Sequence, residues 1–284
     1  MNIFSYLLRV AILTLLASGT HASVKVASLP QPSSVPGGIA VIPTEIEAIE
    51  GNYRNERVLL ANYNGVQYAI VGIPLTVEAG KENLYLDLPG GQKRTISFQV
   101  EAKTYTEQHL TVTNSRQVNP NPSDMERISR ERSEMDSAFS SWNENFVPTF
   151  EMSSPVAGVR SSSFGLKRFF NGQARNPHSG MDIAADEGTP IYAPAAGQIV
   201  ATGNYFFNGN TIILDHGHGL ISLYCHMNTI DVELGTRVAA GDQIGKVGQT
   251  GRVTGPHLHW TVYLNKTRIN PESLLDGKFL ESIP

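Results

Sequence analysis

Histidine is concentrated in one part of this chain, close to an aspartate that could act with it. Six of the eight histidines lie between positions 178 and 259. Those that could act together form three groups: the pair His178 and Asp182, the pair His257 and His259, and the single His226. Residues two apart on a strand face the same side, so both imidazoles of the second pair can enter one cleft. Gly180 can provide a tight bend that turns the side chains of the first pair toward one point.

These residue types suit metal-assisted hydrolysis. Two histidines and one carboxylate are a common ligand set for catalytic zinc, with a fourth position left open for water. Zinc in such a site acidifies water and polarises a carbonyl group. The two remaining histidines could act as acid and base. A His-x-His pair alone is more often an ordinary feature of a strand, but three groups in one glycine-rich β segment favour the catalytic interpretation.

The segment from about 150 to 271 resembles the lysostaphin/LytM-type zinc metallopeptidases, which cut peptides of bacterial peptidoglycan and share a duplicated-hybrid-motif fold. The resemblance is carried by Ser163-Phe164-Gly165, His178-Ser179-Gly180-Met181-Asp182, Ala193-Pro194-Ala195-Ala196-Gly197, Asp215-His216-Gly217, Thr250-Gly251 and Gly255-Pro256-His257-Leu258-His259-Trp260. It implies one Zn(II) per chain with His178, Asp182 and His259 as ligands. It also implies that His226 and His257 form the catalytic pair, without saying which is the base.

One departure concerns the oxyanion of the tetrahedral intermediate. Some members of the family have a tyrosine shortly before the first ligand, whereas residues 165–178 contain Phe169 and Phe170 but no tyrosine. Support for the oxyanion would then come from the histidines, from Asn171 or from Arg168.

Basic residues flank the motifs, namely Lys167, Arg168, Arg175 and Arg252. Wall stem peptides carry free carboxylates, so we expect one or more of these side chains to face the cleft and pair with such a group. Asn171 is a further candidate for substrate binding. A solvated surface charge is the alternative for each basic residue.

Two further histidines and the cysteine are expected to have structural roles. His216 and His218 are expected in a polar loop at the end of a strand, because five groups already fill the catalytic roles. Cys225 is the single cysteine, which excludes an intrachain disulfide and a cysteine-based zinc cluster. It is expected to face the core on the side of its strand opposite His226.

The patterns around these motifs predict a mainly β protein. Short β runs separated by turn signals, including Asn64-Gly65 and Gly90-Gly91, predict a small β-sandwich-like domain over 23–115. A helical connector is expected over 116–149, and a glycine-rich antiparallel β catalytic domain over 150–284.

The connector is expected to contain one helix at about 122–142. Asn121 can cap it and Pro122 suits its first position. An apolar stripe follows helical spacing and must pack against something. It consists of Met125, Ile128, Met135, Phe139 and Trp142.

Residues 1–22 read as a signal peptide, with a basic Arg9, a short apolar run and a small-x-small cleavage site at Thr20-His21-Ala22. The alternative, a membrane anchor, is disfavoured by the shortness of the run. The formal net charge of −4 disfavours nucleic acid as a partner. We therefore expect an exported protein with no stable membrane anchor, most simply in the periplasm.

The sequence predicts a zinc endopeptidase for peptidoglycan cross-links, with D-alanyl–diaminopimelate bonds as its substrate because no wall-binding repeat or sorting tail is visible. Two alternatives remain open. One is a relative that binds the wall or activates another hydrolase without cutting. The other is a cytoplasmic phosphocarrier of similar β architecture, which would not need Asp182. The region ahead of the catalytic domain is expected to dock on it and restrict the cleft, or else to act as a spacer or targeting module.

Overall fold

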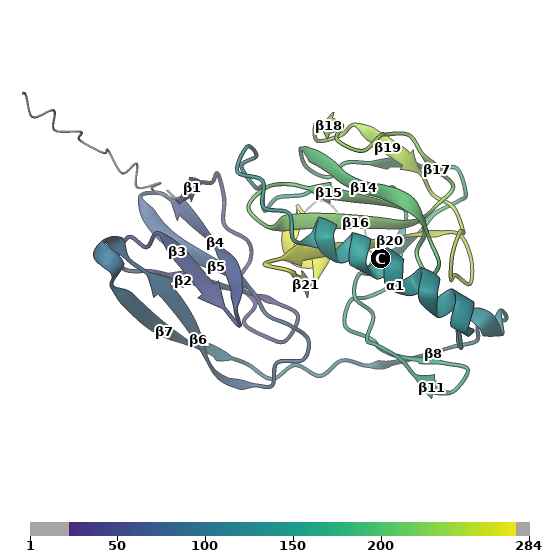
Figure 1. Ribbon diagram of the computed structural model, residues 1–284, viewed down its shortest axis with the longest axis horizontal. Coiled ribbons are helices and arrows are strands. Elements are labelled where there is room, and N and C mark those ends of the chain that lie inside the picture. Colours follow the sequence, from purple (N-terminus) through teal and green to yellow (C-terminus); the bar gives the residue numbers. More distant parts are fainter. Residues whose placement is uncertain (1–22, 277–284) are drawn as a thin grey trace, which may run out of the picture.

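The computed structural model describes residues 23–276, which form two β-rich halves joined by an extended segment and one helix (Figure 1). The proposed signal peptide, residues 1–22, lies outside the described residues. The predicted fold class is confirmed: a β domain precedes a single helix, and a second β domain follows it. No helix in the described part of the chain is both long enough and apolar enough to cross a membrane.

The N-terminal half is built from short antiparallel strands in the order β2-β5-β4-β3-β6-β7, with β1 paired to β4. Their bounds are β1 Val24–Lys25, β2 Ile39–Pro43, β3 Glu50–Tyr53, β4 Glu56–Tyr63, β5 Val66–Gly72, β6 Gly80–Asp87 and β7 Lys93–Val100. The expected hairpin at Asn64-Gly65 joins β4 to β5, with φ angles of 50° and 82° that Asn and Gly tolerate best. Gly90 and Gly91 lie in the turn η1, Pro89–Gly91, between β6 and β7.

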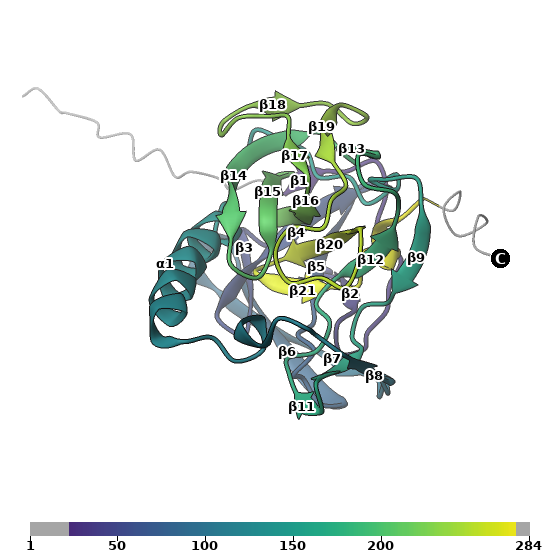
Figure 2. The same ribbon diagram turned by 90° about the vertical axis from the view of Figure 1, so that its right-hand side faces the viewer.

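The C-terminal half is organised around one large sheet in the order β18-β14-β15-β16-β20-β12-β9, with β21 paired to β20. The bounds are β9 Val159–Ser162, β12 Met181–Ala184, β14 Gly197–Tyr205, β15 Gly209–Asp215, β16 Leu220–Met227, β18 Arg237–Val238, β20 His257–Leu264 and β21 Thr267–Ile269. A smaller sheet is formed by β13 Pro190–Tyr192, β19 Gln243–Lys246 and β17 Thr229–Ile230. A last turn, η3, covers Pro271–Leu274. Figure 2 shows α1 to one side of these strands.

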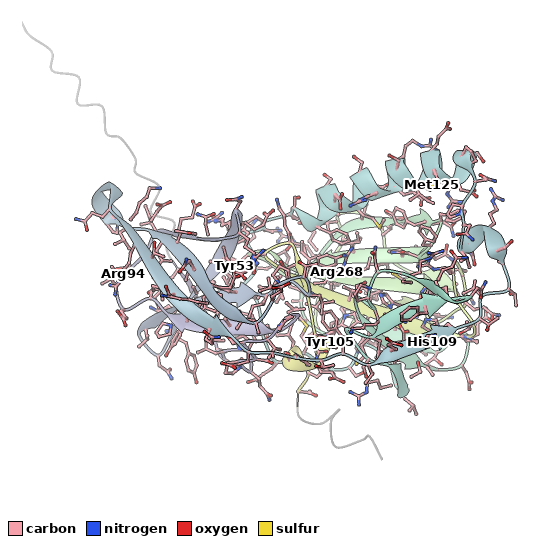
Figure 3. All side chains as sticks on the ribbon, turned by 90° about the horizontal axis from the view of Figure 1, so that it is seen from below. Tyr53, Arg94, Tyr105, His109, Met125 and Arg268 are labelled. Atoms are coloured by element: carbon pink, nitrogen blue, oxygen red, sulfur yellow. The ribbon has the colours of Figure 1, made fainter. Side chains whose placement is uncertain are left out.

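The linker, residues 101–121, runs from the N-terminal half to the helix along the catalytic half. Its strand β8, Glu107–Leu110, pairs in parallel with β10, Lys167–Phe170, and β10 pairs with β11, Gln173–Ala174. The turn η2, Ser115–Gln117, follows. The labelled side chains Tyr105 and His109 mark the linker in Figure 3. The linker is therefore part of a three-stranded sheet and not a free tether.

The helix α1, Pro122–Phe139, begins as predicted and ends earlier than predicted. Asn121 and Asp124 form a reciprocal capping box at its start. Its C-terminal end packs Ala138 and Phe139 against buried residues of the large sheet, and the rings of Phe139 and Tyr263 stack with centroids 4.0 Å apart. Figure 1 shows α1 lying across β14, β15 and β16.

The apolar stripe predicted for α1 is only partly buried. Met125 is 52% exposed, on the outside of the helix (Figure 3), while Phe139 is buried. Trp142 lies beyond the helix, where the Arg57 guanidinium stacks on its ring at 4.1 Å. Trp142 thus connects the N-terminal half to the chain segment after α1.

The two halves share one hydrophobic core. Ile39, Leu59 and Ile70 of the N-terminal sheet belong to the same buried cluster as Leu264 and Ile269 of the C-terminal half. Across this contact the backbone N–H of Gly72 donates to Asn265 Oδ1 at 2.8 Å, and Asn265 Nδ2 donates to the Gly72 carbonyl at 3.3 Å. The N-terminal half is therefore docked firmly on the domain that carries the histidine motifs.

Candidate metal centre and active-site cleft

Strand pairing brings three potential metal ligands together. In the antiparallel pairing of β12 with β20, Asp182 lies directly opposite His259. His178 approaches from the segment just before β12. The three ligand atoms, His178 Nε2, Asp182 Oδ1 and His259 Nδ1, are 2.7–3.1 Å from one another. Within the described residues, these three form the one group with the geometry to hold a metal ion.

Each imidazole has a hydrogen-bond partner on the side away from the other two ligands. His178 Nδ1 lies 2.7 Å from the carbonyl oxygen of Ser163, which can only accept, so Nδ1 carries the proton and Nε2 keeps its lone pair. His259 Nε2 lies 2.9 Å from Thr261 Oγ1, a hydroxyl that can donate or accept, while Nδ1 faces Asp182 and His178. Such outer partners are typical of metal-binding histidines. With two neutral imidazoles and a carboxylate, the residues fit Zn(II).

Gly180 lies at a bend, as the sequence suggested, and lack of space is a further reason for glycine at this position. A Cβ atom at position 180 would lie 2.5 Å from both the Trp260 carbonyl oxygen and Thr261 Oγ1, and 2.8 Å from His259 Cε1. The main chain before Asp182 can approach β20 only because this side chain is absent.

His226 and His257 lie side by side next to the metal-ligand group, with ring centroids 4.8 Å apart. His226 Nδ1 lies 2.8 Å from the Thr250 carbonyl oxygen, and His257 Nδ1 lies 2.8 Å from that of Gly255. Each Nδ1 therefore donates its proton, which leaves Nε2 as an acceptor. Burial, together with His257 and His259 nearby, holds the pKa of His226 well below its usual value. At neutral pH this ring is therefore uncharged and able to accept a proton.

Arg168 binds the carboxylate of the candidate ligand Asp182. Its Nη2 donates to Asp182 Oδ2 at 2.8 Å, the carboxylate oxygen that does not face the two histidines. Its Nε donates to Gln108 Oε1 of the linker at 3.1 Å. Arg168 therefore orients the carboxylate of the candidate ligand, and the linker orients Arg168.

The other candidates for substrate binding are placed differently. The side-chain amide of Asn171 is hydrogen-bonded to the linker. The Val112 backbone N–H donates to Asn171 Oδ1, and Asn171 Nδ2 donates to the Val112 carbonyl. Asn171 does not line the cleft. Lys167 is exposed on β10. Arg175 and Arg252 do line the cleft, beside His178, His226 and His259.

The cleft is a cavity of about 380 Å³. Its walls come from His259, His226, the loop at 207–208, the segment 175–179 that includes His178, Arg252 and Val118 of the linker. Sequence reasoning did not identify Gln108, Gln117 or Val118 as neighbours of the site. No pattern in the linker signals them, because their position depends on the pairing of β8 with β10.

His216 and His218 stand apart from the cleft. His216 lies in the loop that follows β15, as expected, but its side chain is buried: Nδ1 donates to the Ala196 carbonyl and Nε2 accepts from Ser222 Oγ. His218 packs its ring against the edge of Trp142. Cys225 is buried in the cluster beneath α1, and burial raises the pKa of its thiol to about 12.

Comparison with known proteins agrees with this architecture. The model of peptidase family M23 matches residues 176–271, and the model of the peptidase family M23 N-terminal domain matches residues 32–103. A crystal structure from Pseudomonas aeruginosa described as a peptidase M23 is 38% identical to this chain, with a TM-score of 0.72. That match covers 85% of this chain and 95% of the other. This chain therefore belongs to peptidase family M23.

Curated relatives match mainly the C-terminal half. The peptidoglycan DD-endopeptidase ShyA of Vibrio cholerae is 39% identical over 111 residues, which are 39% of this chain and 26% of ShyA. The DD-carboxypeptidase/endopeptidase Mpg of Neisseria meningitidis is 39% identical over 114 residues, 40% of this chain and 26% of Mpg. The matched segment thus spans about a quarter of the length of these relatives.

Proposed function

We propose that this chain is an exported zinc endopeptidase that hydrolyses peptide cross-links of bacterial peptidoglycan, with D-alanyl–diaminopimelate bonds as the substrate. The observation that carries the proposal is the convergence of three potential ligand atoms beside two further histidines whose Nε2 atoms can accept a proton. The relatives named as DD-endopeptidases support the choice of substrate.

In this proposal His178, Asp182 and His259 hold one Zn(II), which when bound supplies Lewis acidity toward a peptide carbonyl and water. His226 or His257 accepts the proton of the attacking water on Nε2, because its Nδ1 proton is engaged with a backbone carbonyl. The charged ring that results stabilises the tetrahedral intermediate and can then protonate the leaving amine.

The test measures zinc content and cleavage separately. His178→Ala, Asp182→Ala and His259→Ala should lose both zinc and activity, whereas His226→Ala and His257→Ala should lose activity and keep most of the zinc. His109→Ala is the matched control, because its ring is exposed on β8, where it stacks on Phe169, and does not belong to the ligand group. Released peptides from purified sacculi, identified by mass spectrometry, report the bond cut. Zinc binding without cleavage by the unaltered chain would favour the non-hydrolytic alternative.

The linker supports a second part of the proposal, that the N-terminal region restricts the cleft. Gln117 Nε2 donates to the Gly251 carbonyl at 2.8 Å on one wall, and Arg175 Nη2 donates to the Val118 carbonyl at 3.0 Å on the other. Val118 lines the cavity between them. The linker therefore bridges both walls, and a long cross-linked peptide must displace it to bind.

A chain that begins at Pro148 does not test this restriction alone, because it also lacks α1. The truncation would expose Ile213 and Ile221, which pack against Phe139. Changing Gln117 to Ala and Val118 to Gly in the full chain removes the Gln117 hydrogen bond to Gly251 and the Val118 side chain from the cavity, keeps the Val118 carbonyl that accepts from Arg175, and leaves α1 docked. Faster cleavage of soluble cross-linked peptides by this variant would support restriction. Unchanged cleavage of soluble peptides would instead favour a spacer or targeting role.

Export is proposed from residues 1–22 and from the wall-acting relatives. The experiment is to express the full chain and determine the N-terminus of the protein in the periplasmic fraction. Cleavage after Ala22 is the expected result.

A further inference from the structure

The basic side chains near the cleft differ in what they already bind. Arg168 is paired with Asp182. Arg175 donates to four neutral oxygens, from the Ala174 and Val118 carbonyls and the side chains of Asn119 and Gln173. Within residues 23–276, the Arg252 guanidinium has one long hydrogen bond, from Nη1 to the Gln117 carbonyl at 3.4 Å, and no carboxylate partner.

Arg252 is nevertheless held in a fixed position. Its guanidinium carbon lies 4.8 Å from the ring centroid of Phe170 and 4.4 Å from that of Phe207. Its backbone N–H donates to the Phe207 carbonyl at 2.8 Å. Two aromatic rings therefore support the planar group, while most of its five N–H donors have no protein acceptor.

This placement has a free-energy cost that the two rings offset only in part, because no carboxylate in the described residues pairs with the guanidinium. Burial, with Arg168 and Arg175 nearby, lowers the pKa of Arg252 to about 10, so the group is still charged at neutral pH. A partly buried cation among other cations is unfavourable without an anion. An anionic ligand in the cleft would supply the missing partner, and a carboxylate matches the planar donors best.

The ligand must be part of the substrate, because Arg252 lines the same cavity as His178, His226 and His259. In the cross-link named above, the carbon that carries the leaving amine also carries a free carboxylate. We propose that Arg252 binds the free carboxylate next to the scissile amide and thereby selects peptides in which that group is ionised. This inference rests on the proposed function. Of the four basic candidates, it assigns recognition of the substrate carboxylate to Arg252 alone.

The experiment uses the mature full chain loaded with zinc and two synthetic cross-linked peptides. The peptides differ only at the carboxylate next to the scissile amide, which is free in one and amidated in the other. The unaltered chain should have a kcat/KM at least about 10-fold higher for the free acid, since a charge-assisted hydrogen bond is lost on amidation. For Arg252→Gln the ratio of the two kcat/KM values should fall close to one.

Arg237→Gln is the matched control, because the Arg237 guanidinium also stacks on a phenyl ring, that of Phe146, but does not line the cavity. It should keep the ratio of the unaltered chain. Zinc content and thermal stability of both variants identify any loss of folding.

Two results would overturn the proposal. The unaltered chain could cleave both peptides equally well, a test that needs no variant. Arg252→Gln could keep the preference, for example by slowing both peptides by the same factor, which would give Arg252 a purely structural role. If zinc-loaded unaltered chain cleaves neither peptide, the proposed function itself fails, and the proposal fails with it.

Discussion

Gly180→Ala is the smallest change that tests how the metal centre is built. The added Cβ would lie 2.5 Å from two oxygen atoms of β20 and 2.8 Å from His259 Cε1, whereas real Cβ contacts stay beyond 3.0 Å. The two segments must therefore separate by about 0.5 Å or more. One of the crowded atoms is Thr261 Oγ1, which is hydrogen-bonded to His259 Nε2, so the movement displaces a candidate ligand.

The expected result is a zinc affinity about 10- to 100-fold weaker, the range found when outer partners of metal ligands are disturbed. A displacement of this size also exceeds the tolerance of a catalytic arrangement. Overpacking should lower the free energy of unfolding by about 1–3 kcal/mol. Competition with a chromophoric chelator measures the zinc affinity, and thermal denaturation of the metal-free protein measures the stability.

Gly255→Ala is the matched control. Gly255 lies two residues before His257, as Gly180 lies two residues before Asp182, but a Cβ at position 255 would meet no heavy atom within 4 Å. This variant should bind zinc as the unaltered chain does. If Gly180→Ala also binds zinc with unchanged affinity, the close approach at Gly180 does not control the ligand geometry, and that result would refute the reasoning.

Two further predictions concern stability. Burial lowers the pKa of His216 to about 4, whereas the pKa of an unfolded histidine is about 6.5. The unfolded chain therefore binds the proton more readily, and the free energy of unfolding falls as the pH drops through this interval. This residue alone should account for a loss of about 2 kcal/mol between pH 7.5 and pH 5, and urea unfolding at both pH values should show a smaller loss for His216→Gln. Asn265→Gly keeps the left-handed backbone at φ 43° but leaves the buried Gly72 amide without its acceptor. It should cost about 1–3 kcal/mol and expose the N-terminal half to limited proteolysis, whereas unchanged protection would show that the hydrophobic contact alone holds the halves together.

Local patterns in the sequence predicted the parts of the fold and site that depend on neighbouring residues. The capping residues Asn121 and Pro122 placed the start of α1 correctly. The end was predicted at about position 142 because Trp142 fits the apolar spacing, but Trp142 packs on Arg57 of the N-terminal half after the helix has ended. Tertiary packing decided that boundary, and the spacing could not reveal it.

The same limit applies to the basic residues of the cleft. Arg168 and Arg252 are equivalent in the sequence, since both flank histidine motifs. Only the fold shows that Arg168 is paired with a carboxylate and that Arg252 lies between two phenyl rings. The burial of His216 was missed for a related reason, because the sequence placed this residue in a loop but did not show that Ala196 and Ser222 bind its two ring nitrogens.

The position of β20 in the large sheet has a consequence for the order of folding. His178 and His259 are 81 positions apart, and β12 reaches its neighbour β20 only after β14, β15 and β16 have been added. Contacts between such distant positions form late, because closing long loops costs entropy before the contacts are gained. In a chain that emerges N-terminus first, the N-terminal half, the linker and α1 precede the last ligand strand. We therefore expect the segment that spans the cleft to be available before the metal centre can assemble, so that the site is covered from the moment it forms.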